Sequence, residues 1–133
     1  YTYSGHPAAC AVAIENIRIL QREQLIERVS NDIGPYLQEK WHKLGEHPLV
    51  GDTRMVGVMG ALELVANKNT LECFEEDKHA GTICRDFLID NRLVMRAVGD
   101  TIVVAPPLIL THEQADKLVE TTWQCLDLTQ AVL

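Results

Sequence analysis

The first part of the chain carries apolar residues at helical spacing in two successive segments. Between residues 8 and 20 they recur every three or four positions, which predicts an amphipathic helix with one buried stripe. That stripe consists of Ala9, Val12, Ala13, Ile17 and Leu20. Pro7 suits the first helical turn, after Ser4 or His6. A second helical stripe spans residues 25–44, and Gly34-Pro35 is expected to kink or break it.

After residue 48 the pattern changes to short apolar runs separated by glycine. Residues 56–65 are expected to form one strand, and residues 80–88 return to helical spacing. Two compact apolar runs follow, at 93–95 and 102–104, with Gly99-Asp100 between them. A Gly-Asp pair favours a tight turn, so these runs predict an antiparallel hairpin.

The last segment begins with a helix-capping signature. Thr111 and Gln114 have the spacing of a capping box, ahead of a helix with apolar residues on one side. The residues expected to face inward are Ala115, Leu118, Val119, Thr122 and Leu126. The order helix, helix, strand, helix, strand, strand, helix predicts one α+β domain over residues 1–133, in which helices cover a small, largely antiparallel sheet.

Composition and charge limit the classes of partner that the protein is expected to bind. The chain is 47% hydrophobic, has a formal net charge of −7 and a pI near 5.1. An acidic surface disfavours both nucleic acid and anionic membranes, so small molecules or proteins are the expected ligands. Charged residues interrupt every apolar run well short of the roughly 20 residues that span a bilayer. The sequence therefore predicts a soluble protein with no membrane or nucleic-acid partner.

The cysteines and histidines do not have the spacing of a metal site. Cys10, Cys73, Cys84 and Cys125 form no C-x-x-C pair, and the five histidines lie apart in polar contexts. A chain with this apolar content does not need disulfides. We expect no metal and reduced, mostly buried thiols, which indicate a cytoplasmic protein.

Arg96 is the most informative single residue. It lies between the apolar residues of the predicted hairpin, where a guanidinium needs an anionic partner. Its planar fork suits a carboxylate or a phosphate. The alternative is a structural ion pair with Asp100 or Glu63, with the aliphatic stem lying over the sheet.

Two hydroxyls, a histidine and five lysines are further candidate site residues. Thr2 and Ser4 precede a helix N-terminus, so they can bind a phosphate or simply cap that helix. His6 is expected to be a turn residue with no catalytic role. The five lysines lie in polar stretches of the sequence. None has the apolar surroundings that activate a lysine to form a Schiff base.

Three stretches resemble the class III, fold type I, pyridoxal-phosphate-dependent aminotransferases. They are Tyr1-Thr2-Tyr3-Ser4-Gly5-His6-Pro7, Arg54-Met55-Val56-Gly57, and Leu93 to Asp100 with the following Ala105-Pro106-Pro107-Leu108. The resemblance covers the whole chain. It is nearest to the ω-aminotransferases that pair pyruvate with putrescine or a similar amine.

The resemblance implies a division of roles. It identifies the chain as the C-terminal domain of a longer enzyme whose cofactor-binding lysine and large domain lie outside it, so the isolated chain is expected to be inactive. Thr2 would contact the phosphate of pyridoxal 5'-phosphate bound to the neighbouring subunit, which implies a homodimer with shared active sites. Arg96 would bind the carboxylate of pyruvate or alanine and move aside for a diamine.

Alternatives remain open within this resemblance. Other class III activities are ornithine, 4-aminobutyrate and β-alanine aminotransferases and the related aminomutase, and the isolated fragment could act only as a folding and dimerisation module. One position departs from the family. Met55 stands where a glycine is common, which would cost about 1–2 kcal/mol if that position needs a positive φ.

Overall fold

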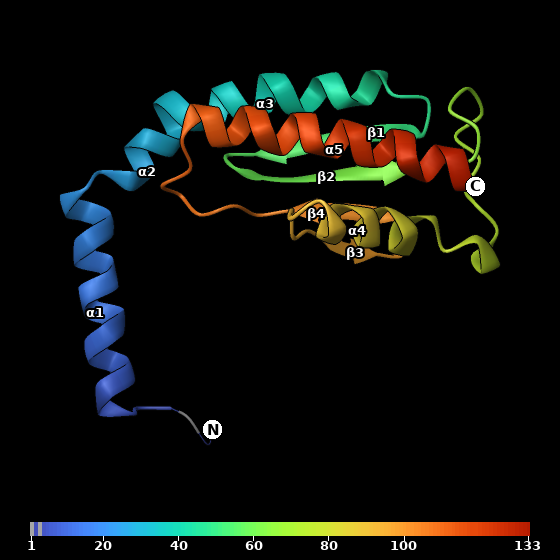
Figure 1. Ribbon diagram of the computed structural model, residues 1–133. Helices are drawn as coiled ribbons and strands as arrows, with labels where there is room; N and C mark the ends of the chain where they lie inside the picture. Colours follow the sequence, from blue (N-terminus) through green and yellow to red (C-terminus); the bar gives the residue numbers. More distant parts are fainter. Residues whose placement is uncertain (1, 3) are drawn as a thin grey trace.

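Four antiparallel strands form the centre of the fold in the computed structural model, which describes residue 2 and residues 4–133 (Figure 1). The strands are β1 (Val50–Val56), β2 (Met59–Leu64), β3 (Arg96–Val98) and β4 (Thr101–Val104). Their order across the sheet is β1-β2-β4-β3, and every neighbouring pair is antiparallel. The predicted α+β class with a small antiparallel sheet is confirmed.

Three helices pack on one face of this sheet. Helix α3 (Gly34–Lys43) packs on β1, α4 (Ala80–Asp90) packs on β3 and β4, and α5 (His112–Val132) lies against both α3 and α4. Alternate strand residues point into this layer and are buried, which is the pattern of a sheet covered on one side. The largest fully buried side chains include Trp41, Leu37, Leu62, Leu88, Ile102 and Leu126.

The capping box at the start of α5 is confirmed. The Gln114 N–H donates to Thr111 Oγ1 at 3.2 Å, and the Thr111 N–H donates to Gln114 Oε1 at 3.0 Å. The inward side of α5 also agrees with its periodicity, because Ala115, Leu118 and Thr122 are buried.

The predicted single strand over residues 56–65 is wrong in its extent. The structure has a hairpin here, in which β1 ends at Val56, Gly57 turns the chain with φ 58°, and β2 begins at Met59. The sequence before Val56 contains Asp52 and Arg54 and looks polar. These residues face away from the helices, so half of β1 is hydrophilic although it is regular strand.

Helix α1 (Pro7–Arg22) is confirmed as a helix but not as a buried one. His6 is its N-cap, and His6 Nδ1 accepts a hydrogen bond from the Ala9 N–H at 3.4 Å. None of its residues is buried, and Val12 is 70% exposed. Figure 1 shows α1 projecting away from the sheet and its helical layer. The predicted apolar stripe is therefore present but has no described segment packed over it.

The expected interruption at Gly34-Pro35 takes the form of a π-helical turn. Helix α2 (Leu25–Arg28) continues into this turn at Val29–Ile33, and the Gly34 N–H donates to the Val29 carbonyl five residues back. Proline has no N–H and crowds the preceding turn, so a locally wider helix accommodates it. Two short 3₁₀ turns, Leu44–Glu46 and Glu76–Lys78, complete the helical segments.

The hairpin that carries Arg96 is held by the start of α4. Gly99 turns the chain between β3 and β4 with φ 56°, as the sequence predicts, although the first strand starts at Arg96 rather than at 93. The Gly81 N–H donates to Asp100 Oδ1 at 2.8 Å. A Cβ on Gly81 would lie 2.1 Å from the Gly99 carbonyl oxygen, so only glycine permits this approach.

We predict that Gly81→Ala destabilises the fold by about 1–3 kcal/mol or more, because the added methyl group meets backbone atoms that cannot move independently. Urea unfolding followed by circular dichroism measures the change. Thr82→Ala, at the next and exposed position of α4, is the control and should stay within about 0.5 kcal/mol of the wild type. Equal stability of the two variants would contradict the close approach.

His47 is a buried titratable group that joins two ends of the fold. Its Nδ1 accepts from the Leu49 N–H at 3.1 Å, and its Nε2 lies 3.2 Å from Asp127 Oδ1 on α5. The ring also packs edge-on against Trp123. Burial lowers the pKa of His47 below its usual 6.5, although the Asp127 carboxylate acts in the opposite direction.

We predict that His47 makes the fold less stable in mild acid. Its folded-state pKa lies below the unfolded one, so its contribution is fully present above about pH 6.5 and declines as the pH falls below that value, by at most about 1.4 kcal/mol per pH unit. Urea unfolding between pH 7.5 and 5 measures this slope. His47→Gln should flatten it, whereas His79→Asn, at an exposed histidine, should not. The same slope in all three proteins would contradict the assignment.

Candidate functional site on the open sheet face

The face of the sheet opposite the helices is uncovered by any described element. Strand alternation brings two rows of side chains to this surface, which we call the open face. In one row, Arg54 pairs with Ala61, Ala61 with Val103, and Val103 with Arg96. The second row joins Asp52, Glu63, Thr101 and Val98.

Arg96 is the first residue of edge strand β3 and is exposed on this face. Its cross-strand neighbour Val103 contributes an apolar surface beside the guanidinium stem. Arg96 forms no ion pair with a described residue. The guanidinium is therefore available for an external anion, and a carboxylate matches its bidentate geometry.

The two acids proposed as structural partners of Arg96 are engaged elsewhere. Asp100 accepts the hydrogen bond from the Gly81 N–H at 2.8 Å, and Glu63 lies 3.4 Å from Arg54. Neither acid forms an ion pair with Arg96 in the described part of the chain, so the structure does not show the internal pair considered as the alternative.

Arg54 differs from Arg96 although both belong to the same row. Its guanidinium lies 3.3 Å from Asp52 and 3.4 Å from Glu63, so two carboxylates neutralise it. Between the two arginines lie only the small side chains of Ala61 and Val103. Arg96 is thus the cation of this row that lacks an internal partner among the residues described.

Met55 needs no special backbone. Its φ is not in the left-handed region, so the cost expected for replacing a flexible glycine does not arise. The side chain is buried on the helix side, and its Cε packs over Gly60, where a Cβ would lie only 2.6 Å away. The departure at Met55 therefore fills space in the core rather than altering the open face.

Thr2 lies in the turn ahead of α1 and is exposed. His6 caps that helix, so the alternative that Thr2 or Ser4 caps it is wrong. Neither hydroxyl has a hydrogen-bond partner in the described part of the chain. Tyr1 and Tyr3 of the same motif lie outside the described residues. The free Thr2 hydroxyl can donate to an external phosphate.

The structure does not bring Thr2 and Arg96 into one site. Thr2 is at the far end of the projecting α1, whereas Arg96 is on the sheet (Figure 1). A single copy of this chain therefore presents two separate potential contacts. This separation agrees with the resemblance, in which the Thr2 position serves the neighbouring subunit.

Other candidate groups are unsuited to nucleophilic chemistry. Hydrogen bonding to the Asp116 carboxylate raises the pKa of Lys40, and Lys40 in turn lowers the pKa of Asp116. A Schiff-base lysine needs the opposite shift. Burial raises the pKa of the Cys84 thiol to about 11 and also raises that of Cys125. Both thiols are free, as are the exposed Cys10 and Cys73, so the expected mostly buried set is only half correct.

Sequence reasoning missed Arg28, which positions the loop after β4. Its guanidinium donates to the carbonyl oxygens of Leu108, at 2.7 Å, and Leu110. Asp32 lies 3.9 Å from the same guanidinium. Pro106 and Pro107 were the sequence signal for such a contact. They have no backbone N–H and favour an irregular loop, so the carbonyls of this loop need donors from elsewhere in the chain.

Neither a metal cluster nor a membrane span is found among the described residues. Residue 2 and residues 4–133 contain no group of three or more histidine, cysteine or acidic side chains placed to hold a metal ion. No helix in that part of the chain is long and apolar enough to cross a bilayer.

Comparisons with known proteins identify the family of the chain. It is 52% identical over all 133 residues to the putrescine–pyruvate aminotransferase of Pseudomonas aeruginosa, and spans 29% of that protein. It is 35% identical over 130 residues to a mitochondrial gamma aminobutyrate transaminase of Solanum lycopersicum, covering 98% of this chain and 25% of that protein.

Solved structures agree with these sequence matches. A PMP-bound aminotransferase from Vibrio fluvialis superposes with a TM-score of 0.91 at 32% identity, covering 98% of this chain and 29% of the other. A transaminase from ancestral reconstruction gives a TM-score of 0.93 at 36% identity, covering 100% and 30%. The sequence profile of the family described as Aminotransferase class-III matches residues 1–126. The chain therefore belongs to the class III aminotransferase family, and its fold is that of a part of the fold type I transaminases.

Proposed function

We propose that the protein carrying this chain is a pyridoxal-phosphate-dependent aminotransferase that moves an amino group from a diamine such as putrescine to pyruvate. The observation that carries this proposal is the 52% identity, over the whole chain, to a putrescine–pyruvate aminotransferase. The gamma aminobutyrate transaminase is only 35% identical, so 4-aminobutyrate is the second candidate amine. Because the chain spans 29% of its relative, the activity belongs to the longer protein.

Arg96 supplies the substrate contact in this proposal. Pyruvate and alanine each carry one carboxylate, and Arg96 offers one guanidinium without an internal partner on the open face. The apolar floor of Ala61 and Val103 beside it suits a small substrate body. A diamine has no carboxylate, so it requires no contact from Arg96.

The family implies pyridoxal 5'-phosphate as cofactor, and Thr2 fits one contact to it. When bound, this cofactor accepts and returns the amino group. Thr2 has an exposed hydroxyl with no described partner, which suits a phosphate oxygen. The Schiff-base lysine is assigned to the longer protein, because the lysines of this chain lie in exposed or half-exposed polar surroundings.

We further propose that residues 1–133 are a single C-terminal domain of a cytoplasmic homodimer. The separation of Thr2 from Arg96 supports the dimer, because one subunit then contributes Thr2 to the site that its neighbour builds around the cofactor. The exposed stripe on α1 is consistent with a helix that lies between larger parts of an assembly.

Steady-state assays of the full-length enzyme test the overall assignment. Putrescine, cadaverine, 4-aminobutyrate and β-alanine are each paired with pyruvate and with 2-oxoglutarate. Putrescine with pyruvate should give the highest kcat/KM. Preference for 4-aminobutyrate over both diamines would instead support the second candidate.

We predict that Arg96→Ala in the full-length enzyme raises the KM for pyruvate and alanine about tenfold to a hundredfold, because charge-assisted hydrogen bonds contribute roughly 1.5–3 kcal/mol. The putrescine half-reaction, followed by cofactor absorbance in a single turnover, should keep most of its rate. Arg96→Lys should rescue pyruvate only in part, since an ammonium lacks the bidentate fork.

Arg54→Gln is the matched control for Arg96, because it changes an arginine of the same row that already has two carboxylate partners. It should alter the pyruvate KM less than about threefold. If Arg96→Ala lowered the rates of the pyruvate and putrescine half-reactions equally, Arg96 would instead stabilise the fold or contribute to cofactor binding.

We predict that Thr2→Val weakens cofactor binding about tenfold to a hundredfold, because valine keeps the shape but removes a charge-assisted hydrogen bond. Equilibrium dialysis of the full-length enzyme against pyridoxal 5'-phosphate measures the dissociation constant. Ser4→Ala, at an exposed hydroxyl two residues away, serves as the control. An unchanged dissociation constant for Thr2→Val would remove Thr2 from the phosphate site.

A further inference from the structure

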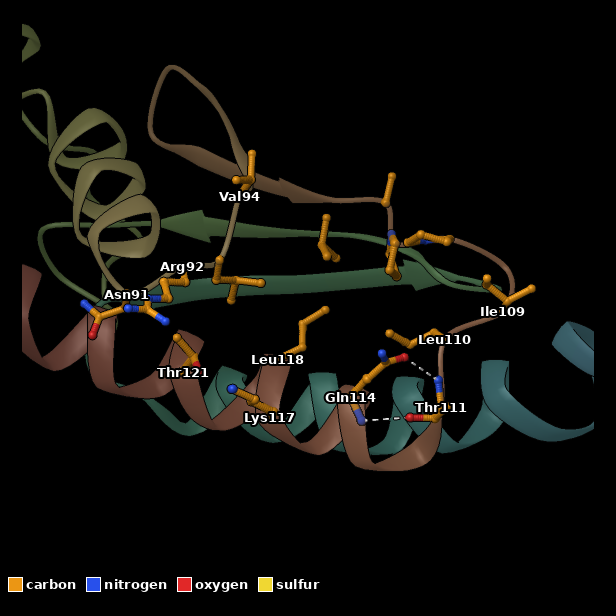
Figure 2. Close-up of a pocket in the computed structure, with 15 residues that line it drawn as sticks. Asn91, Arg92, Val94, Ile109, Leu110, Thr111, Gln114, Lys117, Leu118 and Thr121 are labelled. Carbon is orange, nitrogen blue, oxygen red and sulfur yellow. Dashed lines mark hydrogen bonds between the residues drawn. The ribbon is translucent and has the colours of Figure 1, made fainter.

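A cavity of about 740 Å³ lies beside α5 (Figure 2). It is bounded by residues 91–94, which follow α4, by the loop at 105–111 and by one side of α5. Val104, which faces the helices, forms part of its wall, so the cavity is separate from the open face. Its volume is within the range of small-molecule sites, roughly 300–1,000 Å³.

The cavity is amphipathic. Its apolar walls come from side chains such as Leu93, Val94, Leu110 and Leu118. Figure 2 shows Arg92, Asn91 and Thr121 toward one end of the cavity and Ile109 toward the other, with Lys117 on the same helix as Thr121. Thr111 and Gln114 also line the cavity but hydrogen-bond to each other, so a ligand with one polar end near Arg92 and an apolar body matches this arrangement.

The charge of the lining favours an anion. Arg92 and Lys117 are its charged residues, and no acidic side chain lines it. Neither cation has an ion pair with a described residue. Glu113 and Glu120, one turn on either side of Lys117, are not part of the lining, and all four of these charged residues are exposed.

The backbone of Arg92 is an independent observation. Its φ is 64°, in the left-handed region. The Arg92 N–H donates to the Ile89 carbonyl and the Leu93 N–H to the Leu88 carbonyl, which is the Schellman arrangement that ends a helix. Glycine or asparagine usually occupies this position, because a longer side chain is unfavourable there. Arg92 shares this unfavourable backbone with Gln24, Leu71 and His79, and it is the one of the four that lines the cavity.

We propose that this cavity binds an amphipathic monocarboxylate, with its carboxylate between Arg92 and Lys117 and an unbranched alkyl chain along the apolar walls. Arg28 stabilises the far wall by holding the carbonyls of Leu108 and Leu110. The competing explanation is that both residues are ordinary surface cations, with Arg92 offsetting the negative end of the α4 dipole.

Isothermal titration calorimetry of the full-length protein with octanoate tests the proposal. Two matched ligands distinguish the contribution of the carboxylate from that of the alkyl chain. The first, n-octylamine, has the same chain with the opposite charge, and the second, acetate, has the carboxylate alone. Octanoate should bind at least tenfold more tightly than either. Absence of octanoate binding, or equal binding of octanoate and n-octylamine, would overturn the proposal.

Arg92→Gly separates binding from folding. Glycine suits the left-handed backbone, so the thermal unfolding temperature should not fall, whereas octanoate affinity should drop at least tenfold. Lys117→Gln should also weaken octanoate. Two control variants should leave octanoate affinity unchanged. Arg85→Gln removes an arginine of α4 that pairs with Asp86 outside the cavity. Arg96→Ala removes the unpaired cation of the open face. Full affinity in Arg92→Gly, or a loss in Arg96→Ala, would contradict the site.

Discussion

Side chains alternate between the two faces of a strand, and the position of every polar group on this sheet depends on that alternation. Leu62 and Ile102 point into the helical layer, while their neighbours Ala61 and Val103 point away from it. A register slip of one residue would bury Arg96 among apolar side chains and expose the core. The contact of Gly81 with the Gly99-Asp100 turn holds the hairpin against α4, so a core contact also determines where the guanidinium lies.

A second constraint acts on the loop that follows β4. Pro106 and Pro107 end the sheet, and the loop carbonyls that follow need donors from elsewhere. Arg28 provides them from the end of α2, and Asp32 lies beside both Arg28 and, at 2.9 Å, His112 at the start of α5. The π-helical turn lies within this set of contacts. The irregular helix, the loop and the start of α5 are therefore mutually supported.

Local sequence signals predicted the elements well where one pattern dominated. The capping box of α5 and the Gly99-Asp100 turn depend on a few adjacent residues, and both are confirmed. Strand β1 was missed because only half of its side chains are in the core, and its polar half resembles a loop. The stripe on α1 was identified, but periodicity shows that a face is apolar and cannot show what covers it. Arg28 and Arg92 were missed because their roles depend on contacts distant in sequence or on a backbone angle.

The two arginines of the open face show why residue type alone could not identify the site. Arg54 and Arg96 occupy one cross-strand row, are both exposed, and are separated by two small apolar residues. The second row distinguishes them. Near Arg54 this row contains two acids, Asp52 and Glu63, which are cross-strand neighbours. On the strand of Arg96 it contains the apolar Val98 instead. The two carboxylates beside Arg54 make the local potential less positive than at Arg96, so Arg54 attracts an external anion less strongly. The cross-strand neighbours, and not the arginine itself, therefore leave Arg96 without an ion pair among the described residues of this face, which supports its proposed role in carboxylate binding.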